Sequence, residues 1–477
     1  MKYKPIFIMG TSSGAGKSTL VTALCRIFTN MGINVVPFKA QNMSLNAGVG
    51  IGGEMAYAQV LQAKACGKIP NVKMNPVLLK PEEDKTQIIL NGKYYGTINA
   101  ENYMKSSKND LFKIILRDFK YLSDRNDLVI IEGAGSPAEI NIKHDIANTI
   151  LAKKIKSKNI LVSDIDRGGS FASIVGTVEL LGKDLFSGYI LNKFRGNENL
   201  LKNGYDFLFE KYSLKHYGTI PYLENNLPEE DSLRSWHGKK GKINVSIIKL
   251  PHLANATDFH IFSKIREIGF NFSTSPDEIN NADIVILPGS KLTISDLIFL
   301  RNEGFEDKIL ELYKDGTRII GICGGYQMMG EYIIDEFETK YGKIDGLKIL
   351  ESRTEFDRRK KVSLIRGKVL HKEFFNYNIS GYEIHFGKSI SKNPFSLITN
   401  ENGKNVNRYD GSASKNAFGT YFHDLFFNLN FVEKLLNDIA KEKGLDKIVV
   451  NYNLDDEINS IAEIFKKYLD VESILND

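Results

Sequence analysis

The sequence predicts two α/β domains, each built on a mainly parallel β-sheet. In the first half of the chain, short apolar segments alternate with stretches whose apolar residues recur at helical spacing. These apolar segments lie at residues 6–9, 34–38, 128–131, 160–163 and 189–191. After a polar interruption the alternation begins again at 243–250 and continues through 283–290 and 317–325. Strands that alternate with helices usually pair in parallel, so we expect parallel α/β architecture in both halves.

The chain length and the polar interruption predict the domain boundaries. A chain of 477 residues exceeds what a single hydrophobic core usually organises. The charged segment PEEDSLRSWHGKKGK separates the two alternations, and helical patterns follow residue 427. We predict an N-terminal domain at residues 1–228, a linker at 229–242, a second domain at 243–432 and a C-terminal helical segment at 433–477.

A glycine-rich segment, GTSSGAGKST, follows the first apolar segment and leads into an amphipathic helical pattern. Strand, loop and helix in this order indicate a phosphate-binding loop. Backbone N–H groups would bind phosphate oxygens, the Lys17 ammonium would neutralise their charge, and the Ser18 hydroxyl would bind Mg²⁺. The segment departs from the strict pattern, because Thr11 stands where the first glycine is expected. The candidate ATP-binding residues of this loop are Gly14, Gly16, Lys17, Ser18 and Thr19.

Two acidic residues end buried apolar segments, at the sheet edge where open α/β folds bind ligands. Glu132 ends one segment in VIIEGAG, and Asp164 ends another in SDIDRGG. Mg²⁺ prefers one or two carboxylates together with phosphate oxygens, so Ser18, Glu132 and Asp164 are the predicted metal ligands. For Asp164 and Asp166, a loop cap or a salt bridge explains the pattern equally well.

Other polar residues follow strands at the same edge. Lys39, Gln41 and Asn42, in PFKAQN, come directly after the second apolar segment. Arg167 follows Asp166 and could meet a phosphate or a carboxylate. These four residues are candidates for binding or activating a substrate.

The segment TRIIGICGGYQMMG, residues 317–330, indicates a different chemistry. An apolar strand runs into Cys323 between glycines, and a helical segment follows, which is how a strand–turn–helix elbow presents a nucleophile. The N–H of Gly324 can approach a developing oxyanion. His423 ends another predicted strand, in NAFGTYFHDLF, and supplies a base. A buried, inert thiol is the alternative for Cys323 considered alone.

Glu383 and His385, in GYEIHFG, alternate onto one face of a predicted strand. They are candidates for residues that border the thiol site, and a structural role explains the pair equally well. The remaining histidines show no metal-ligand spacing.

Composition narrows the class of protein. The net charge of +5 is interspersed with acids along the chain, which gives no support for nucleic-acid binding. We find no apolar stretch of the roughly 20 residues needed to span a bilayer, and the N-terminus leads directly into a strand without room for a signal peptide. The 3 cysteines form neither a disulfide framework nor a Cys-x-x-Cys site. We therefore expect a cytoplasmic enzyme in a reducing compartment.

The motifs together resemble those of the cobyric acid synthases, the glutamine-dependent ligases of cobalamin biosynthesis in the cobyrinate amidotransferase family. They run in family order from residue 10 to residue 426. The most specific are KAQNMSLN, EGAGSPAEIN and DIDRGG, because other enzyme families share a phosphate loop or a cysteine elbow. The other segments that carry the resemblance are GTSSGAGKS, MNPVLLKP, NKFRG, LPEEDSL, LPGSKLTISDL, GICGGYQMMG, GYEIHFG and GTYFHDLF.

The resemblance implies a fold and a reaction. It predicts a dethiobiotin synthetase-like P-loop domain with a parallel sheet, followed by a class I glutamine amidotransferase-like α/β domain. ATP and Mg²⁺ would activate substrate carboxylates as acyl phosphates, and a Cys–His glutaminase would release ammonia from glutamine. The substrate would be adenosylcobyrinic acid a,c-diamide, amidated at positions b, d, e and g to give adenosylcobyric acid.

The resemblance also assigns individual residues. Gly289, in LPGS, would provide the second N–H group of the oxyanion hole, and Asn192, in NKFRG, matches a segment that meets the nucleotide base. Common class I amidotransferases carry a Glu two residues after the His to orient the imidazole, but here Leu425 occupies that place. Asp424 is adjacent to His423, and adjacent strand residues point to opposite faces. We therefore expect a Cys–His dyad, oriented by the backbone or by a more distant group.

Two alternatives remain at this point. Cobyrinic acid a,c-diamide synthase shares both modules, although KAQNMSLN and SPAEIN favour the cobyric acid synthases. A P-loop ATPase with a non-catalytic amidotransferase-like domain that only binds a partner is the other alternative. The presence of both Cys323 and His423 counts against it.

Overall fold

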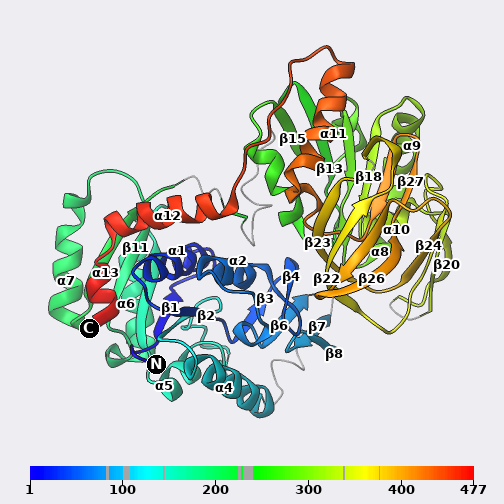
Figure 1. Cartoon of the computed structure of the whole chain (residues 1–477). Coiled ribbons are helices and arrows are strands. Elements are labelled where there is room, and N and C mark those ends of the chain that lie inside the picture. Colours follow the sequence, from blue (N-terminus) through cyan, green and yellow to red (C-terminus); the bar gives the residue numbers. More distant parts are fainter. Residues whose placement is uncertain are drawn as a thin grey trace. The chain divides into compact units, whose positions relative to one another are not determined.

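The computed structural model describes residues 1–81, 85–99, 108–142, 145–223, 227–228, 240–336, 339–374 and 376–476. The chain divides into two compact units (Figure 1). The first unit comprises Met1–Ser44, Gly50–Leu227 and Asn453–Asp477, and the second comprises Leu45–Val49 and Pro228–Tyr452. Of the predicted linker at 229–242, residues 229–239 lie outside the described residues. Each unit therefore combines segments that are far apart in the sequence.

The first unit is built on a six-stranded sheet in the order β12-β11-β10-β1-β9-β2. Every pairing in this sheet is parallel, which confirms the predicted α/β architecture. Five of its strands fall on the predicted apolar segments, and β12 was not predicted. The strands are β1 (Ile6–Gly10), β2 (Val35–Phe38), β9 (Leu128–Glu132), β10 (Lys158–Asp164), β11 (Gly188–Phe194) and β12 (Lys215–Pro221).

Helices cover both faces of this sheet, because alternate residues of each strand point to opposite faces. Ile6 and Ile8 of β1 belong to one hydrophobic cluster, and Phe7 and Met9 belong to another. The first cluster is completed by α1 (Lys17–Asn30), α12 (Leu454–Tyr468) and α13 (Val471–Asn476). The second is completed by α4 (Asn109–Ser123), α5 (Thr149–Ile155), α6 (Ser170–Leu181) and α7 (Lys202–Tyr212), and α2 (Tyr57–Ala65) contributes to both.

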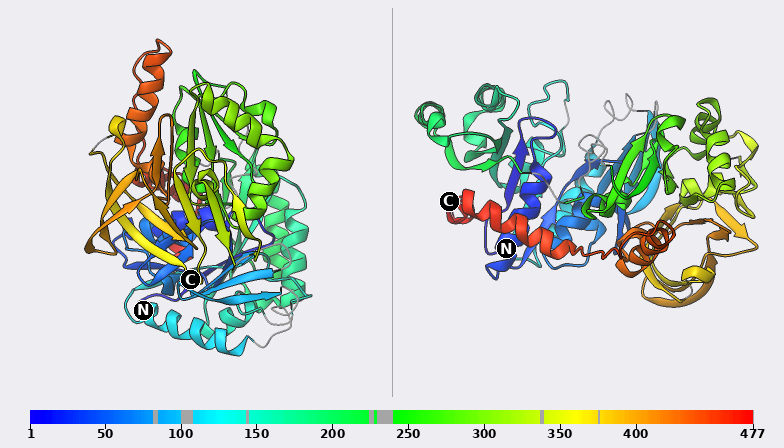
Figure 2. Two further views of the ribbon diagram at one scale, coloured as in Figure 1. Left: turned by 90° about the vertical axis from the view of Figure 1, so that its right-hand side faces the viewer. Right: turned by 90° about the horizontal axis from the view of Figure 1, so that it is seen from above.

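The helices predicted at 433–477 do not form one segment. The first of them, α11 (Leu429–Glu442), belongs to the second unit, whereas α12 and α13 belong to the first. α12, red in Figures 1 and 2, packs beside α1, and its Phe465 is buried in the first cluster. The apolar stripe of α12 thus covers a sheet whose strands precede it by more than two hundred residues in the sequence.

A smaller sheet completes the first unit. Its strand order is β3-β6-β7-β8, with β3 (Gln41–Met43), β6 (Val77–Pro81), β7 (Lys85–Leu90) and β8 (Lys93–Asn99). Two further short strands are β5 (Gly53–Ala56), which belongs to the first unit, and β4 (Ala47–Gly50), whose residues up to Val49 belong to the second.

The second unit has its own six-stranded sheet, in the order β15-β13-β16-β18-β28-β27. Its pairings are parallel except for the antiparallel pair β27 and β28. The strands are β13 (Ile243–Ile248), β15 (Ile268–Ser273), β16 (Ile284–Leu287), β18 (Arg318–Ile322), β27 (Ser412–Ser414) and β28 (Ala417–Thr420). The helices of this unit are α8 (Thr293–Asn302), α9 (Phe305–Lys314), α10 (Gly324–Met329) and α11.

Two additional four-stranded sheets lie between α10 and β27 in the sequence, and neither was predicted. One has the order β20-β19-β21-β24 and the other β23-β22-β25-β26. Their strands are β19 (Tyr332–Asp335), β20 (Gly342–Asp345), β21 (Ser352–Glu355), β22 (Lys361–Val369), β23 (Asn378–His385), β24 (Lys388–Ser391), β25 (Ser396–Glu401) and β26 (Lys404–Asp410). A two-residue pairing joins β14 (Leu253–Ala254) to β17 (Gly289–Ser290).

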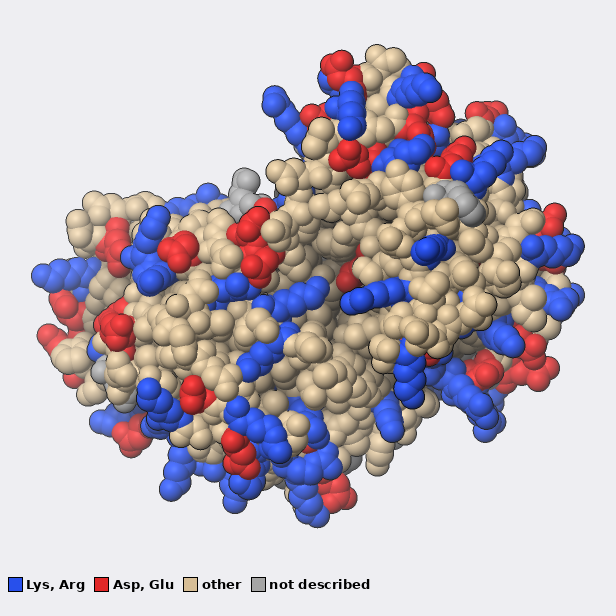
Figure 3. Space-filling model, in the orientation of Figure 1, with Lys and Arg blue, Asp and Glu red and all other residues tan. Residues whose placement is uncertain are grey.

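Two surface properties bear on the predicted partners. Basic and acidic side chains are interspersed on each unit in the view of Figure 3. Among the described residues, no helix combines the length and apolar character that a membrane crossing requires.

Candidate active site

Cys323 occupies the predicted elbow between β18 and α10. Its backbone has φ 52° and ψ −107°, a conformation that residues other than glycine rarely adopt. The Cys323 N–H donates to the Thr420 carbonyl at 2.8 Å, and the thiol donates to the Ile384 carbonyl at 3.5 Å. Strained backbone at a nucleophile is typical of catalytic sites, where the surrounding structure maintains it.

His423 follows β28 and is buried beside this thiol. Its Nδ1–H donates to Oδ2 of Asp258 at 2.7 Å. Burial lowers the pKa of the imidazole, but the charge and hydrogen bond of Asp258, together with those of the Cys323 thiol, outweigh burial and raise the pKa of His423 to about 10. The imidazole therefore favours its protonated form next to the thiol, an arrangement that supports a thiolate.

Asp258 is the group that the sequence did not identify. It lies in the short 3₁₀ helix Ala256–Lys264 and is almost completely buried. Its second oxygen, Oδ1, accepts the backbone N–H of Asp424 at 3.1 Å. The predicted pair of Cys323 and His423 thus has a more distant orienting carboxylate, and Asp424 contributes its backbone to hold that carboxylate. The sequence offered only a weak signal for it, a single acid in the segment LANATDF.

Two glycines border the space beside the thiol. A Cβ atom on Gly289 would lie 3.4 Å from Cε1 of His423, and one on Gly324 would lie 2.8 Å from the backbone nitrogen of Ser290. A side chain on Gly324 would clash with this nitrogen, whereas one on Gly289 would make ordinary contact with the imidazole. Gly289 therefore borders the imidazole of His423, and Gly324 directly follows Cys323 in the chain.

Glu383 and His385 also lie in the second unit, on β23. Glu383 is fully buried and accepts a hydrogen bond from Arg408, and its Oε2 lies 3.5 Å from Nε2 of His385. The imidazole of His385 stacks on Tyr421 with ring centroids 3.6 Å apart. Between them in the chain, Ile384 offers its carbonyl to the Cys323 thiol. Both predicted residues thus take part in a polar network on the strand whose Ile384 carbonyl contacts the thiol.

The phosphate loop joins β1 to α1 in the first unit. The Lys17 ammonium donates to the carbonyls of Ser12 at 3.2 Å and Gly135 at 2.9 Å. Gly14 and Gly16 have φ of 73° and 93°, in the left-handed region that favours glycine. The Lys17 ammonium is thus held against loop carbonyls, and the backbone has the form that only glycine adopts readily.

Asn192, at the end of β11, lies against this loop. Its side-chain amide donates to the Ala15 carbonyl at 2.9 Å, and a Cβ atom on Gly16 would lie only 2.0 Å from that amide nitrogen. The structure thus brings Asn192 to the phosphate loop, where its amide supports the loop backbone.

Glu132, at the end of β9, is the centre of a buried network. Oε1 accepts from the Ser18 hydroxyl and from the Lys39 ammonium, both at 2.7 Å. Oε2 accepts from the side-chain amides of Gln59, at 3.3 Å, and Gln62. Burial raises the pKa of this carboxyl, but the charge and hydrogen bond of Lys39 outweigh burial and lower the pKa below its usual value. Glu132 is therefore ionised, and with the Ser18 hydroxyl it forms a pair of oxygen donors suited to Mg²⁺.

The other predicted residues of this edge have different partners. Asp164 accepts from the Lys193 ammonium and from the Asp166 N–H, both at 3.0 Å, so it forms the salt bridge and loop cap that were the alternative to metal binding. Arg167 is exposed in the following turn. Within the described part of the chain, no group of three or more His, Cys, Asp or Glu residues is arranged to hold a metal ion.

Lys39, Gln41 and Asn42 lie at the start of the smaller sheet. Lys39 is buried against Glu132, and the Asn42 side-chain amide donates to Oε1 of Gln59 at 3.0 Å. Gln41 begins β3 and is partly exposed. Lys39 and Asn42 thus belong to the Glu132 network. The sequence indicated only that both residues follow a strand at the same edge of the sheet.

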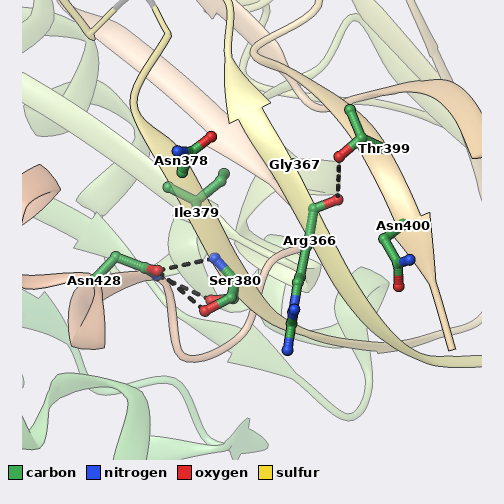
Figure 4. A pocket seen from close by; sticks show the side chains of 8 residues that line it. All are labelled: Arg366, Gly367, Asn378, Ile379, Ser380, Thr399, Asn400 and Asn428. Carbon is green, nitrogen blue, oxygen red and sulfur yellow. Dashed lines mark hydrogen bonds between the residues drawn. The ribbon is translucent and has the colours of Figure 1, made fainter. Parts of the chain in front are cut away.

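A separate pocket of about 410 Å³ opens on β22, β23 and β25 of the second unit (Figure 4). Its lining contains no cysteine, histidine or carboxylate, so it offers no nucleophile or acid–base group. Figure 4 shows the Asn428 side chain turned toward Ser380, whose N–H donates to it at 2.8 Å. The lining residues are Arg366, Gly367, Asn378, Ile379, Ser380, Thr399, Asn400 and Asn428. This pocket is therefore not the candidate active site.

Comparison with known proteins identifies both domains. A family model described as "CobQ/CobB/MinD/ParA nucleotide binding domain" matches residues 6–233, and one described as "CobB/CobQ-like glutamine amidotransferase domain" matches residues 244–431. A protein of Thermococcus gammatolerans named "Probable cobyric acid synthase" is 47% identical over 481 residues, covering 99% of both chains. The "Cobyric acid synthase" of Clostridium novyi is 41% identical over 496 residues, covering 99% of this chain and 97% of its own.

These relatives separate the alternatives left open by the sequence, because they extend over nearly the full length of both chains and carry the cobyric acid synthase name. An ATP-binding domain and a glutamine amidotransferase domain in one chain are those of an amidotransferase ligase of cobalamin biosynthesis. The chain belongs to the cobyric acid synthase family.

Proposed function

We propose that this enzyme amidates the b, d, e and g side-chain carboxylates of adenosylcobyrinic acid a,c-diamide, using one glutamine and one ATP for each amide. The observation that carries the proposal is the cluster of Cys323, His423 and Asp258 in a chain that also contains a phosphate loop. The cluster supports release of ammonia from glutamine, and the loop supports activation of a carboxylate by ATP. Family membership supports the corrinoid as the acceptor.

Glutamine hydrolysis begins at the thiol. In the thiolate–imidazolium pair the Cys323 proton resides on His423, and the thiolate attacks the side-chain amide carbon of glutamine. Backbone N–H groups of Gly289 and Gly324 stabilise the oxyanion that forms. His423 then protonates the departing ammonia, which leaves a thioester on Cys323. Water, deprotonated by His423, releases glutamate and regenerates the thiol. Asp258 holds the imidazole in one tautomer through the whole sequence and stabilises its protonated form.

Carboxylate activation takes place at the phosphate loop. A carboxylate oxygen of the substrate attacks the γ-phosphorus of ATP, ADP leaves, and the acyl phosphate then reacts with ammonia to give the amide and phosphate. Lys17 neutralises charge on the transferring phosphoryl group. Ser18 and Glu132 would hold Mg²⁺, which would neutralise further phosphate charge, and Asp164, now paired with Lys193, is a candidate for a third ligand.

The remaining predicted residues have proposed roles at one or other of the two sites. Lys39 is buried beside Glu132, and we assign it to the carboxylate or phosphate of the reacting pair, since its ammonium is a compact cation. Gln41, Asn42 and Arg167 are candidates for contacts to the corrinoid side chains. Glu383 and His385 are candidates for the border of the glutamine site, because they flank the carbonyl that contacts Cys323.

Mass spectrometry of the corrinoid tests the proposal. The full chain is incubated with adenosylcobyrinic acid a,c-diamide, ATP, Mg²⁺ and glutamine labelled with ¹⁵N at the side-chain amide. Four successive incorporations of label are expected. Fewer than four at completion, or label in an acceptor other than this corrinoid, would overturn the proposed substrate.

A further inference from the structure

A short segment from the N-terminal part of the chain, Leu45–Val49, belongs to the second unit. Within that unit both polar groups of Ala47 are bound. The Ala47 N–H donates to Oδ1 of Asn255 at 2.9 Å, and the Ala47 carbonyl accepts from the Tyr382 hydroxyl at 2.8 Å. Both hydrogen bonds are buried. The side chains of Asn255 and Tyr382 therefore hold Ala47 through the two peptide groups that flank it.

The same two side chains contact His423. The ring of Tyr382 stacks on the imidazole, with centroids 5.2 Å apart and planes at 18°. Backbone hydrogen bonds also run in both directions between Tyr382 and His423, at 3.3 Å and 2.8 Å. Nδ2 of Asn255 lies 3.2 Å from Nδ1 of His423 and 3.4 Å from the Tyr382 hydroxyl. The two side chains that bind Ala47 are therefore also direct neighbours of the imidazole.

The residues just before this segment belong to the Glu132 network of the first unit. Lys39 forms a salt bridge with Glu132 at 2.7 Å, and Asn42 donates to Gln59 at 3.0 Å. The Ser44 N–H donates to the Leu79 carbonyl at 3.0 Å, and the next residue begins the segment assigned to the second unit. The stretch from Lys39 to Ala47 thus carries groups of the proposed carboxylate-activating site at its start and Ala47 at its end.

We propose that the Leu45–Val49 segment regulates glutamine hydrolysis, with Asn255 and Tyr382 as positioning residues for His423. The proposal rests on the function proposed above. When ATP and the corrinoid bind, the groups that contact the Glu132 carboxylate change. Lys39 must then move, because it shares that carboxylate with the Ser18 hydroxyl. The adjustment passes along the chain to Ala47 and shifts His423 toward its productive orientation. Ammonia is then released when an activated carboxylate is ready to accept it, as expected of two sites coupled through a shared conformational equilibrium.

Tyr382→Phe tests this coupling, because it removes the hydroxyl bonded to Ala47 and keeps the ring stacked on His423. Glutamate release by the full chain is measured with glutamine alone and again with ATP, Mg²⁺ and the corrinoid added. The wild-type chain should be stimulated by these additions. In Tyr382→Phe the ratio of stimulated to basal rate should fall about tenfold. The loss should appear in kcat rather than in KM for glutamine. Tyr409→Phe, which removes a hydroxyl from a side chain that is 70% exposed, is the matched control and should behave as wild type.

A second variant addresses the other hydrogen bond. Ala47→Pro removes the N–H bonded to Asn255 and should also lower the stimulation ratio, whereas Ala47→Gly keeps both peptide groups and should preserve it. Ammonium-fed amidation should remain at the wild-type rate in Tyr382→Phe and Ala47→Pro.

Three results would overturn the regulatory proposal. They are an unstimulated wild-type chain, an unchanged ratio in both variants, and basal and stimulated rates that fall in equal proportion. Failure of the wild-type chain to amidate the corrinoid from ammonium would instead overturn the function on which the proposal rests.

Discussion

Oδ2 of Asp258 lies 2.7 Å from Nδ1 of His423, although 165 residues separate them in the sequence. In the proposed mechanism this contact supplies the carboxylate that orients the base His423 beside the nucleophile Cys323, without the Glu that follows the His in common class I amidotransferases. Leu425, which stands in that place, is buried as an ordinary apolar residue. The carboxylate therefore comes from a different part of the fold, the 3₁₀ helix Ala256–Lys264.

Asp258→Asn should lower kcat for glutamine hydrolysis by roughly 10²- to 10⁴-fold, because an amide neither fixes the tautomer nor stabilises the protonated imidazole. The pH profile should change as well. The folded-state pKa of His423, about 10, lies above the ordinary value for histidine, so the protonated form is lost only as pH rises through about 10. Removing the carboxylate lowers that pKa, and the alkaline limb of kcat/KM should move to lower pH.

Asp424→Asn is the matched control for Asp258→Asn. Asp424 donates its backbone N–H to Asp258, and asparagine also tolerates the left-handed conformation found there, at φ 60°. Glutamine hydrolysis should remain within about twofold of wild type. A loss comparable to that of Asp258→Asn would show that Asp424 rather than Asp258 orients the imidazole.

His423→Asn should reduce glutamine hydrolysis by several orders of magnitude, because the thiol then lacks both its proton acceptor and the donor to ammonia. Amidation from added ammonium salts should continue, since His423 lies outside the first unit. Steady-state assays with the two nitrogen sources measure the difference. Equal losses with glutamine and with ammonium, in a variant that folds, would contradict the assigned role.

Glu132→Gln should raise the Mg²⁺ concentration needed for half-maximal amidation and lower kcat with either nitrogen source. The substitution removes the ionised oxygen paired with the Ser18 hydroxyl and leaves Lys39 without its buried anion. Titration of Mg²⁺ at saturating ATP measures both effects, and thermal unfolding checks that the variant remains folded after Lys39 loses its buried anion. An unchanged Mg²⁺ requirement would exclude Glu132 as a ligand.

Phe465→Ala should destabilise the first unit by about 3–5 kcal/mol, because Phe465 of α12 is buried in the cluster on one face of its sheet. Lys466→Ala, on the exposed side of the same helix, is the control. Denaturant unfolding measures both variants. If Phe465→Ala is as stable as Lys466→Ala, the helix does not contribute to this core.

Much of the fold could be predicted from local sequence patterns. Buried parallel strands are continuous apolar runs, so β1, β9 and β18 were recognisable, and glycines identified the elbow at Cys323 and the phosphate loop. Strand β22 was not recognised, because its exposed Leu364 and buried Ser363 and Gly367 weaken the apolar alternation that predicts a strand.

Contacts between distant parts of the chain could not be predicted. The amphipathic pattern of α12 showed that it buries a face, but nothing in the sequence identified the sheet that it covers. Asp258 was missed for the same reason. It precedes His423 by 165 residues, and the two side chains meet only in the folded second unit. The assignment of Leu45–Val49 to the second unit likewise depends on hydrogen bonds to residues more than two hundred positions away.

The division of chemistry between Cys323 and Lys17 is tested most directly by measuring glutamate release and corrinoid amidation in the same reaction, with either glutamine or ammonium as the nitrogen source. Cys323→Ala should amidate the corrinoid from ammonium and fail with glutamine. Lys17→Ala should still release glutamate at a basal rate and fail to amidate from either source, with the loss in turnover rather than in corrinoid affinity. Amidation from ammonium at the wild-type rate in Lys17→Ala, or loss of both activities in a folded Cys323→Ala chain, would contradict the account.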